Sequence, residues 1–222
     1  MRFRFIARVV CLSIAPLLAY AASVNQLTPQ EKEEGYTLLF NGKNLDGWEG
    51  DPVRWTVEDG VLIGSSDGHP FQVNTFLIHK GTFQNFILKS EIKLRNHNSG
   101  IQFRSEQLPG KGWMVRGYQA DASEVDDAKS AWGNLYEERL RGRNAMKTPD
   151  EGWQIAKPLV HHGDWNTYEI LADGDHIRLT FNGHRTIDMH DRASADGIIA
   201  LQLHAGPEMR VEFRNLKIKK LP

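Results

Sequence analysis

Alternating apolar and polar residues recur along most of the chain in short runs. The clearest run is NFILKSEIKL, at residues 85–94. Its alternate residues fall into two sets, with Phe86, Leu88, Ser90, Ile92 and Leu94 in one and Ile87, Lys89, Glu91 and Lys93 in the other. Because successive side chains of a strand point to opposite faces, this run predicts a β-strand with one face in the core and one face in water.

Similar runs predict strands throughout the chain, at residues 36–40, 55–57, 61–64, 75–79, 101–104, 165–171, 176–181, 184–189, 197–204 and 210–221. Turn signals separate many of them. Asp59-Gly60 lies between two β-rich runs and predicts a tight hairpin, whereas residues 96–100 read as a looser turn. Only Thr28 to Glu34, which begins with Thr-Pro, suggests a short helical turn.

This density of short strands is typical of an all-β sandwich or barrel. A chain of 222 residues is ordinary for a single domain of that class. We find no internal repeat and no low-complexity linker. We therefore expect one domain over residues 35–222, preceded by a short segment at residues 22–34.

The first residues resemble a targeting segment. Arg2, Arg4 and Arg8 precede an apolar run from Val9 to Tyr20, and Ala19-Tyr20-Ala21 fits a small-x-small cleavage site. We expect a signal peptide at residues 1–21, cleavage near Ala21, and export to the periplasm or the medium. The apolar run is shorter than the roughly 18 residues of a membrane span, so we expect no stable membrane insertion; an uncleaved anchor is the alternative.

Composition narrows the chemistry. The single cysteine, Cys11, lies in the predicted signal peptide, so the mature protein would have neither a thiol nucleophile nor a cysteine-ligated metal. The whole chain has 27 Lys and Arg against 28 Asp and Glu, and the mature chain would carry a net charge of about −4. Without a basic block interleaved with aromatic residues, nucleic acid is not an expected partner.

Strand alternation also groups polar side chains. If the apolar positions face the core, one opposite face collects Gln102, Arg104, Gln119, Asp121, Gln202 and His204, with Glu91 added if its strand is central. Amide, guanidinium, imidazole and carboxylate groups of this kind hydrogen-bond sugar hydroxyls. The alternative is ordinary solvation, because antiparallel sheets commonly have one wet face.

The stretch from Gly117 to Asn144 contains the strongest candidates for chemistry. Asp121 ends its predicted strand and is a candidate base or metal ligand; as an alternative it caps the turn that follows. For His204, the alternative to a functional role is that of a plain strand histidine.

Glu137 and Glu138 are adjacent, so in an extended chain only one of them can face the site. We favour Glu138, with Tyr136 on the same face, and expect Glu137 to pair with Arg139 or Arg141. Because a register shift would exchange the two, both glutamates stay candidates.

Aromatic and histidine residues outside this set are less specific. Trp132 and Trp113 are candidate sugar-stacking platforms, whereas core packing is expected for the tryptophans on or beside core strands, Trp48, Trp55 and Trp165. No His-x-x-x-His spacing supports zinc. A divalent cation held by oxygen atoms stays possible, and no other cofactor is expected.

Several motifs occur in a fixed order. They are FNGKNLDGW at 40–48, WTVEDGVLIG at 55–64, NSGIQFRS at 98–105, GYQAD at 117–121, WGNLYEERLRGR at 132–143 and LQLHAGPEMRVEFRNLKIKKL at 201–221. As an ordered set, they resemble the 3-keto-disaccharide hydrolase domain family over residues 35–221.

The resemblance implies a concanavalin A-like jelly-roll sandwich of two curved antiparallel sheets, with the site on the concave face. It also implies an exported enzyme whose substrates are oligosaccharides or glycosides already oxidised at C3 by a separate sugar 3-dehydrogenase. In such a family the glycosidic bond breaks by elimination, and hydration follows to give net hydrolysis.

That route needs a base near C2, an acid near the glycosidic oxygen and a donor or metal for the enolate. Our catalytic candidates are Asp121, Glu137, Glu138, Arg104 and His204. Our substrate-binding candidates are Gln102, Gln119, Tyr118, Trp132, Tyr136, Gln202 and Glu91.

Two alternatives remain. An ordinary glycoside hydrolase of this fold would carry a Glu-x-Asp-x-x-Glu strand, but Glu124-Val125-Asp126 is followed by Ala128, Lys129 and Ser130 where the second Glu belongs. A non-catalytic carbohydrate-binding module would need only the polar floor and an aromatic platform.

Overall fold

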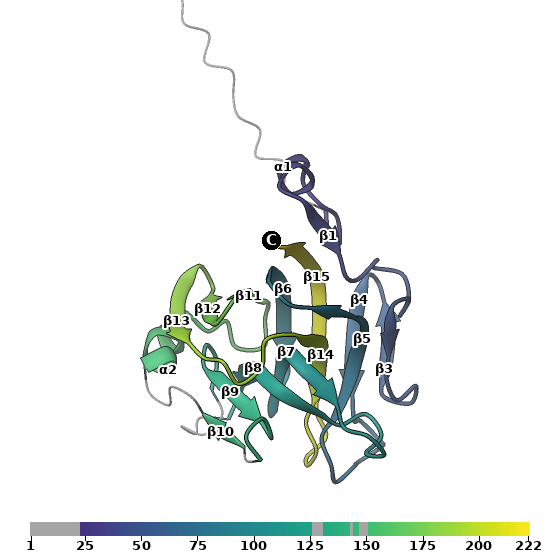
Figure 1. Cartoon of the computed structure of the whole chain (residues 1–222). Coiled ribbons are helices and arrows are strands. Elements are labelled where there is room, and N and C mark those ends of the chain that lie inside the picture. Colours follow the sequence, from purple (N-terminus) through teal and green to yellow (C-terminus); the bar gives the residue numbers. More distant parts are fainter. Residues whose placement is uncertain (1–22, 126–130, 143, 147–150) are drawn as a thin grey trace, which may run out of the picture.

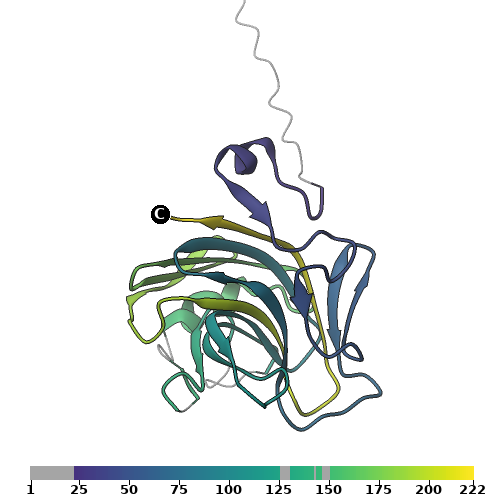
Figure 2. The ribbon, with the colours of Figure 1, turned by 45° about the vertical axis from the view of Figure 1, so that its right-hand side comes forward.

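The computed structural model describes residues 23–125, 131–142, 144–146 and 151–222. The predicted signal peptide at residues 1–21 lies outside these ranges. Within them, two antiparallel β-sheets pack face to face as a concanavalin A-like jelly roll, and the expected all-β fold is confirmed (Figures 1 and 2).

The eight-stranded sheet, here sheet A, has the order β13-β12-β11-β6-β15-β4-β3, with β1 also paired to β15. Its strands are β1 (Tyr36–Leu38), β3 (Trp55–Glu58), β4 (Val61–Ser65), β6 (Phe86–Leu94), β11 (Asn166–Asp173), β12 (His176–Phe181), β13 (His184–His190) and β15 (Arg210–Lys220).

The seven-stranded sheet, here sheet B, has the order β10-β9-β8-β7-β14-β5-β2. Its strands are β2 (Trp48–Glu49), β5 (Thr75–Phe83), β7 (Asn98–Gln107), β8 (Val115–Ser123), β9 (Leu135–Glu138), β10 (Ala145–Met146) and β14 (Gly197–Leu203). We call the side of this sheet that points away from sheet A its outer face.

Local sequence accounts for the predicted hairpin and the predicted helical turn. Between β3 and β4, Asp59 and Gly60 have φ of 48° and 78°, the two positive values that a type I′ turn requires. The first helix, α1 (Pro29–Glu33), begins with a capping box in which Thr28 and Glu31 bond each other's backbone N–H. Both predictions are confirmed.

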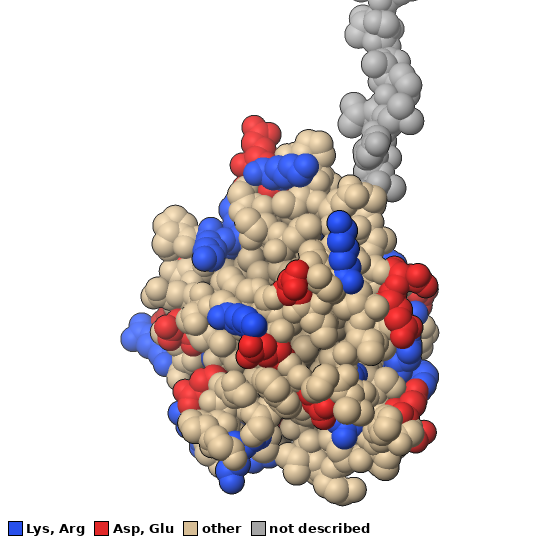
Figure 3. Space-filling model, turned by 90° about the vertical axis from the view of Figure 1, so that its right-hand side faces the viewer, with Lys and Arg blue, Asp and Glu red and all other residues tan. Residues whose placement is uncertain are grey.

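The remaining helical segments are α2 (Glu151–Ala156) and η1 (Lys157–Leu159), between β10 and β11. All helices of the described ranges are too short and too polar to cross a bilayer. On the face drawn in Figure 3, acidic and basic side chains are interspersed, so that face carries no continuous basic stripe.

The hydrophobic core lies between the sheets. Strand β6 buries every second residue from Phe86 to Leu94, as its alternation predicts. From sheet B, Ile101, Phe103 and Leu201 pack into the same core and are fully buried. Because these residues face inward, their neighbours on β7, β8 and β14 face outward.

Strand β7 differs from its predicted form at both ends. It begins at Asn98, inside the segment predicted as a turn, and it contains a bulge between Phe103 and Glu106 where the pairing with β8 shifts register. Arg104 lies in this bulge with φ of 45°. A bulge re-aims side chains, so alternation past Phe103 no longer predicts which face a residue occupies.

Candidate active site

A polar pocket of about 170 Å³ lies on the outer face of sheet B. It is lined by Asn74, Asn98, Gln119, Asp121, Tyr136, Glu138, Asn144, Gln202 and His204. These residues come from or directly adjoin β5, β7, β8, β9, β10 and β14, so a rigid sheet holds most of the lining. We call this cavity the polar pocket.

A directed chain of hydrogen bonds fixes its floor. Ser105 Oγ donates to Gln102 Oε1 at 2.8 Å, and Gln102 Nε2 donates to Gln119 Oε1 at 2.9 Å. Gln119 Nε2 then donates to Asp121 Oδ1 at 2.8 Å and to Gln202 Oε1 at 3.2 Å. Gln119 and Gln202 thus meet in the pocket as predicted, while Gln102 supports Gln119 from outside the lining.

Gly100 makes room for this network. A Cβ at Gly100 would lie 2.5 Å from Cγ and 2.6 Å from Cδ of Gln119, and 2.8 Å from the carbonyl oxygen of Ala120. These distances are far inside van der Waals contact. Gly100 therefore lets the Gln119 side chain lie flat across β7.

Asp121 is 2% exposed, and both of its carboxylate oxygens accept hydrogen bonds. Besides Gln119, Asn98 Nδ2 approaches Oδ1 at 3.4 Å and the backbone N–H of Ala131 donates to Oδ2 at 3.0 Å. The carboxylate therefore lines the pocket and also caps the turn that follows, which is the alternative role considered from the sequence.

Glu138 and Tyr136 reach the pocket from β9. Burial raises the pKa of Glu138, against the opposing effect of Arg139, whose Nε lies 3.2 Å from Glu138 Oε1. Burial, with the nearby Glu138 and Asp121, raises the pKa of Tyr136 to about 12. Tyr136 therefore stays a neutral donor at neutral pH.

Glu137 points to the other side of β9 and is 1% exposed. It accepts a hydrogen bond from Arg141 Nη1, and Arg141 Nη2 contacts both carboxylate oxygens of Asp191 at 2.7 Å. Glu137 lies outside the polar pocket, in a buried ion-pair cluster. As a catalytic candidate, it is not supported by the geometry.

His204 follows β14 and lies at the pocket wall. Its Nδ1 is 2.6 Å from the carbonyl oxygen of Ala205, and His97 Nε2 is 3.0 Å from the same oxygen. A carbonyl oxygen only accepts, so His204 Nδ1 and His97 Nε2 each carry a proton. In a neutral His204, the other nitrogen, Nε2, therefore carries a lone pair. Burial lowers the pKa of His204, and the imidazole of His97, 4.6 Å away between ring centroids, adds to that effect.

Arg104 lies away from the pocket, contrary to our prediction. Its guanidinium donates to the carbonyl oxygens of Gln84 at 2.9 Å and Gly174 at 2.7 Å and to Asn85 Oδ1 at 3.2 Å. The bulge in β7 reverses its direction. Arg104 therefore ties together two loops at one edge of the sandwich.

Glu91 is on the wrong sheet for the predicted role. It lies on β6 of sheet A, where Oε2 accepts from Arg214 Nε at 2.6 Å and Oε1 accepts from Asn215 Nδ2 at 2.7 Å. Because β6 is central in sheet A and not in sheet B, its polar face has no access to the polar pocket.

Of the predicted aromatic contacts, Tyr136 lines the pocket, whereas Tyr118, Trp132 and Trp113 do not. Tyr118 and Trp132 are fully buried in the core, where Tyr118 stacks on Phe103 and Trp132 stacks on Tyr168. Trp113 packs against a small apolar cluster, made of Phe76, Ile78, Val115 and Ala200. Their ring size serves core packing here.

Three asparagines were missed. Asn98 lies in the segment that the pattern predicts as a turn, and its signal in the sequence is the NSGIQFRS motif at 98–105. Asn74 Oδ1 accepts from the backbone N–H of Ala205 at 2.9 Å, and Asn144 Oδ1 accepts from that of Arg139 at 2.9 Å. Both positions lie in loops, where strand alternation makes no prediction.

The pocket is not built as a clear cation site. In the described ranges, no group of three or more His, Asp or Glu side chains is close enough to hold a metal. Asp121 and Glu138 offer oxygen atoms, but both already contact protein donors. We therefore assign no step to a metal.

Comparisons with known proteins show which family and which structures this chain is similar to. The family model for the 3-keto-alpha-glucoside-1,2-lyase-like domain matches residues 35–219. A 3-keto-disaccharide hydrolase from Bacteroides thetaiotaomicron is 33% identical over 100 residues, covering 41% of this chain. That match spans 34% of the relative's own length.

Among solved structures, a candidate glycosyl hydrolase from Parabacteroides distasonis superposes with a TM-score of 0.69 at 25% identity, covering 90% of this chain and all (100%) of the other. A carbohydrate-binding module, CBM66 from Bacillus subtilis, superposes with a TM-score of 0.54 at 18% identity, covering 77% of this chain and 94% of the other. The second likeness shows the fold alone. With a match over almost the whole folded region, the chain belongs to the 3-keto-alpha-glucoside-1,2-lyase-like domain family.

Proposed function

We propose that this protein cleaves glycosides that are oxidised at C3, by elimination followed by hydration. Family membership and the name of the Bacteroides relative support an enzyme that acts on glycosides. The observation that carries the finer proposal is the content of the polar pocket. It combines a buried acid, a neutral imidazole and a phenol that stays protonated.

A ketone at C3 acidifies the C2–H bond, so a modest base suffices. His204 suits this role because its lowered pKa keeps it neutral near pH 7 and, with Nδ1 protonated toward the Ala205 carbonyl, its Nε2 carries a lone pair. It takes the C2 proton as the electrons of that bond move into the enolate. The Tyr136 hydroxyl donates a hydrogen bond to the developing oxyanion on C3.

The enolate then expels the group on C1. A new C1–C2 double bond forms, the C1–O bond breaks, and the departing oxygen takes the proton of Glu138. A raised pKa suits Glu138 to this task, because more of it is in the acid form near neutral pH.

Hydration returns Glu138 and His204 to their starting protonation states. Water adds to C1 as the Glu138 carboxylate takes its proton, and the His204 imidazolium returns a proton to C2. The sum of the steps is one glycoside plus one water giving a free 3-keto sugar and an alcohol. Asp121 and Gln119, fixed by their mutual hydrogen bond, orient the sugar hydroxyls.

The proposed chemistry also implies another enzyme that forms the C3-oxidised substrate. The proposed substrate already carries a ketone at C3, so the proposal includes a separate sugar 3-dehydrogenase that oxidises the glycoside first. Export through cleavage near Ala21, to the periplasm or the medium, belongs to the same proposal and rests on the sequence of residues 1–21.

One observation favours a second candidate function. Asp121 and Glu138 line one pocket, and ordinary glycoside hydrolases use a pair of carboxyl groups. However, both oxygens of Asp121 already accept hydrogen bonds, which leaves it poorly suited to attack C1 or to activate water. A binding module of this fold would need no buried acid at all.

Isotope exchange tests the proposed route. In D₂O, elimination and hydration place deuterium on C2 of the released sugar, whereas direct hydrolysis leaves C2 protonated. We expect deuterium at C2 in early product, above the exchange seen when free 3-keto sugar is incubated with and without protein. Product that retains its C2 proton would contradict the proposal.

A further inference from the structure

We propose that His97 is a positioning residue that keeps the neutral imidazole of His204 protonated at Nδ1; its consequence for catalysis rests on the proposed function. His97 itself does not line the polar pocket. Its Nε2 donates to the carbonyl oxygen of Ala205 at 3.0 Å, and His204 Nδ1 donates to the same oxygen at 2.6 Å. The two imidazoles therefore share one hydrogen-bond acceptor.

His204 lies just beyond the strand that leads into the pocket wall. Strand β14 ends at Leu203, which is also the last paired residue of its ladder with β5. The next residue, Ala205, is held by side chains instead. Its backbone N–H donates to Asn74 Oδ1 at 2.9 Å, and its carbonyl oxygen accepts from the two histidines. Asn74 and His97 therefore hold Ala205 where the strand no longer does.

The shared oxygen decides which nitrogen of His204 carries the proton. A carbonyl oxygen has two lone pairs, so it can accept from both imidazoles at once. A neutral imidazole has one N–H, and the partner of one nitrogen sets the state of the other. While the Ala205 carbonyl faces His204 Nδ1, the proton stays there and Nε2 is unprotonated. If that carbonyl turned away, the proton would be free to move to Nε2, and the proposed base would lose its lone pair there.

The His97 ring also restrains the His204 ring directly. The two rings meet edge to face, with centroids 4.6 Å apart and planes at 70°. Rotation of the His204 ring about its Cβ–Cγ bond would break this contact and its bond to Ala205 together. His97 thus makes two separable contributions, one from its Nε2–H and one from its ring.

The backbone on both sides of this contact takes conformations that few residues adopt. Gly206 has φ of 123°, and a Cβ there would lie 3.0 Å from His97 Nε2. His97 has φ of 68°, in the left-handed region that residues with a Cβ rarely adopt. The backbone N–H of Gly206 makes a long bond, 3.4 Å to the carbonyl oxygen of Phe71, which gives the loop little support. The close approach of His97 therefore depends on special backbone conformations at both residues.

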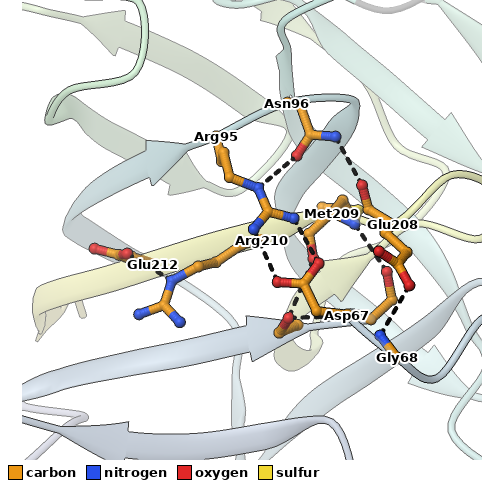
Figure 4. Close-up of polar contacts among 10 residues, drawn as sticks. Asp67, Gly68, Arg95, Asn96, Glu208, Met209, Arg210 and Glu212 are labelled. Atoms are coloured by element: carbon orange, nitrogen blue, oxygen red, sulfur yellow. Dashed lines mark hydrogen bonds and ion pairs between the residues drawn. The ribbon is translucent and has the colours of Figure 1, made fainter.

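Figure 4 shows how the residues just before His97 are tied to their surroundings. Asn96 Nδ2 donates to the carbonyl oxygen of Glu208 at 2.7 Å, which joins this turn to the loop after β14. Both terminal nitrogens of Arg95 contact the carboxylate of Asp67, at 2.8 and 2.6 Å, which joins the turn to the segment after β4. His97 is therefore held in place before any ligand binds.

The protonated nitrogen of His204 can be observed without turnover. In ¹⁵N-labelled protein at mildly alkaline pH, where imidazoles are neutral, long-range ¹H–¹⁵N correlation separates protonated from unprotonated ring nitrogens. The signals of His204 are those that His204→Gln removes. We expect His204 to be protonated at Nδ1 in the unaltered protein. We expect a mixture of both tautomers in His97→Phe, which keeps a ring but loses the N–H.

His97→Gln separates the hydrogen bond from the ring. A glutamine amide can offer an N–H to the Ala205 carbonyl in place of Nε2, so we expect it to restore the Nδ1 tautomer of His204. The control His184→Gln alters an exposed histidine at the start of β13 and should leave the His204 signals unchanged. A His204 that stays fully protonated at Nδ1 in His97→Phe would overturn the proposal. The same mixture of tautomers in His97→Gln as in His97→Phe would also overturn it.

Turnover adds a measurement that depends on the proposed function. With the C3-oxidised methyl glucoside, His97→Phe is expected to lower kcat about tenfold and to leave KM within about twofold, because the pocket lining is intact. His97→Gln should recover most of that loss. A role in ring packing alone would show no such recovery, because glutamine has no ring.

The results for tautomer and turnover separate the two proposals. If His97→Phe changes the tautomer and His97→Gln restores it, but the unaltered protein cleaves no oxidised glycoside, the positioning role stands and the proposed function falls. If the oxidised glycoside is cleaved and the tautomer is the same in all variants, the function stands and the positioning role falls. A changed tautomer with an unchanged kcat would reject His204 as the base, and with it the catalytic consequence of His97.

Discussion

The hydroxyl of Tyr168, on sheet A, crosses the core and donates a hydrogen bond to the main-chain carbonyl of Asp121, on sheet B. The same hydroxyl accepts from the backbone N–H of Gly133 at 2.6 Å. It therefore clamps the strand that carries Asp121 to the turn whose Ala131 N–H bonds the Asp121 carboxylate. Burial raises the pKa of Tyr168 well above its usual value, so the donor proton stays in place.

Tyr168→Phe is therefore expected to disturb the site as well as the core. Two main-chain groups lose a partner, so we expect a loss of about 1–3 kcal/mol in the free energy of unfolding, measured by denaturant titration. We also expect kcat on a 3-keto-glycoside to fall about tenfold through misplacement of Asp121.

Tyr118→Phe is the matched control. Tyr118 is equally buried, but its hydroxyl contacts Asp191 and the N–H of Ala193, away from the polar pocket. It should lose comparable stability and keep its kcat. An equal loss of kcat in both variants would show that the Tyr168 effect is one of stability alone.

Arg139→Gln is expected to shift the pH profile. Activity requires protonated Glu138, so it falls as pH rises through the pKa of Glu138. Arg139 lowers that pKa, against the larger effect of burial, and removing its charge raises it. The alkaline limb of kcat/KM should therefore move to higher pH, measured with the C3-oxidised methyl glucoside.

Arg141→Gln serves as the comparison, because Arg141 pairs with Glu137 and Asp191 and not with Glu138. We expect lower stability and an unmoved alkaline limb. If that limb stays in place in Arg139→Gln as well, Glu138 is not the group that sets it.

Substitutions of the two adjacent glutamates should have different effects, one on kcat and the other on stability. Glu138→Gln removes the proposed acid, and we expect kcat to fall by about 10²–10⁴-fold. Glu137→Gln weakens the buried ion-pair cluster, so we expect a loss of about 1–3 kcal/mol in the free energy of unfolding and little change in kcat. Assays of both variants at equal folded fraction decide this, and the reverse pattern would overturn our assignment.

Gly100→Ala tests the floor of the pocket. The new methyl group would displace the Gln119 side chain and weaken its bond to Asp121, so kcat/KM should fall about tenfold. In the double variant with Gln119→Ala, the clash with the Gln119 side chain disappears and only the contact with the Ala120 carbonyl oxygen stays, so the two losses should be non-additive. Additive losses would mean that Gly100 acts on something other than Gln119.

Much of the fold is predictable from the sequence, because the alternation of apolar and polar residues along a strand shows which side chains are buried. Strand β6 and the Asp59-Gly60 hairpin follow from local pattern, and each has its predicted form. The same reasoning placed Gln119, Asp121 and Gln202 on one face. It also paired Glu138 with Tyr136 opposite Glu137.

The errors have identifiable physical causes. A bulge in β7 turned Arg104 away, and no residue pattern in the sequence marks that bulge. Glu91 was misplaced because alternation gives the face of a strand but not the sheet to which the strand belongs. Trp132 was misjudged because an aromatic side chain serves a core and a sugar platform equally well.

A paired-substrate assay tests the central claim most directly. Purified protein would be offered a C3-oxidised glucoside and the same glucoside without oxidation, with Glu138→Gln as the inactive control, and release of the leaving group would be followed over time. We predict cleavage of the oxidised substrate alone, because only a C3 ketone makes the C2 proton acidic enough for His204. Cleavage of the unoxidised glucoside at a comparable rate, or binding of both without cleavage of either, would contradict it.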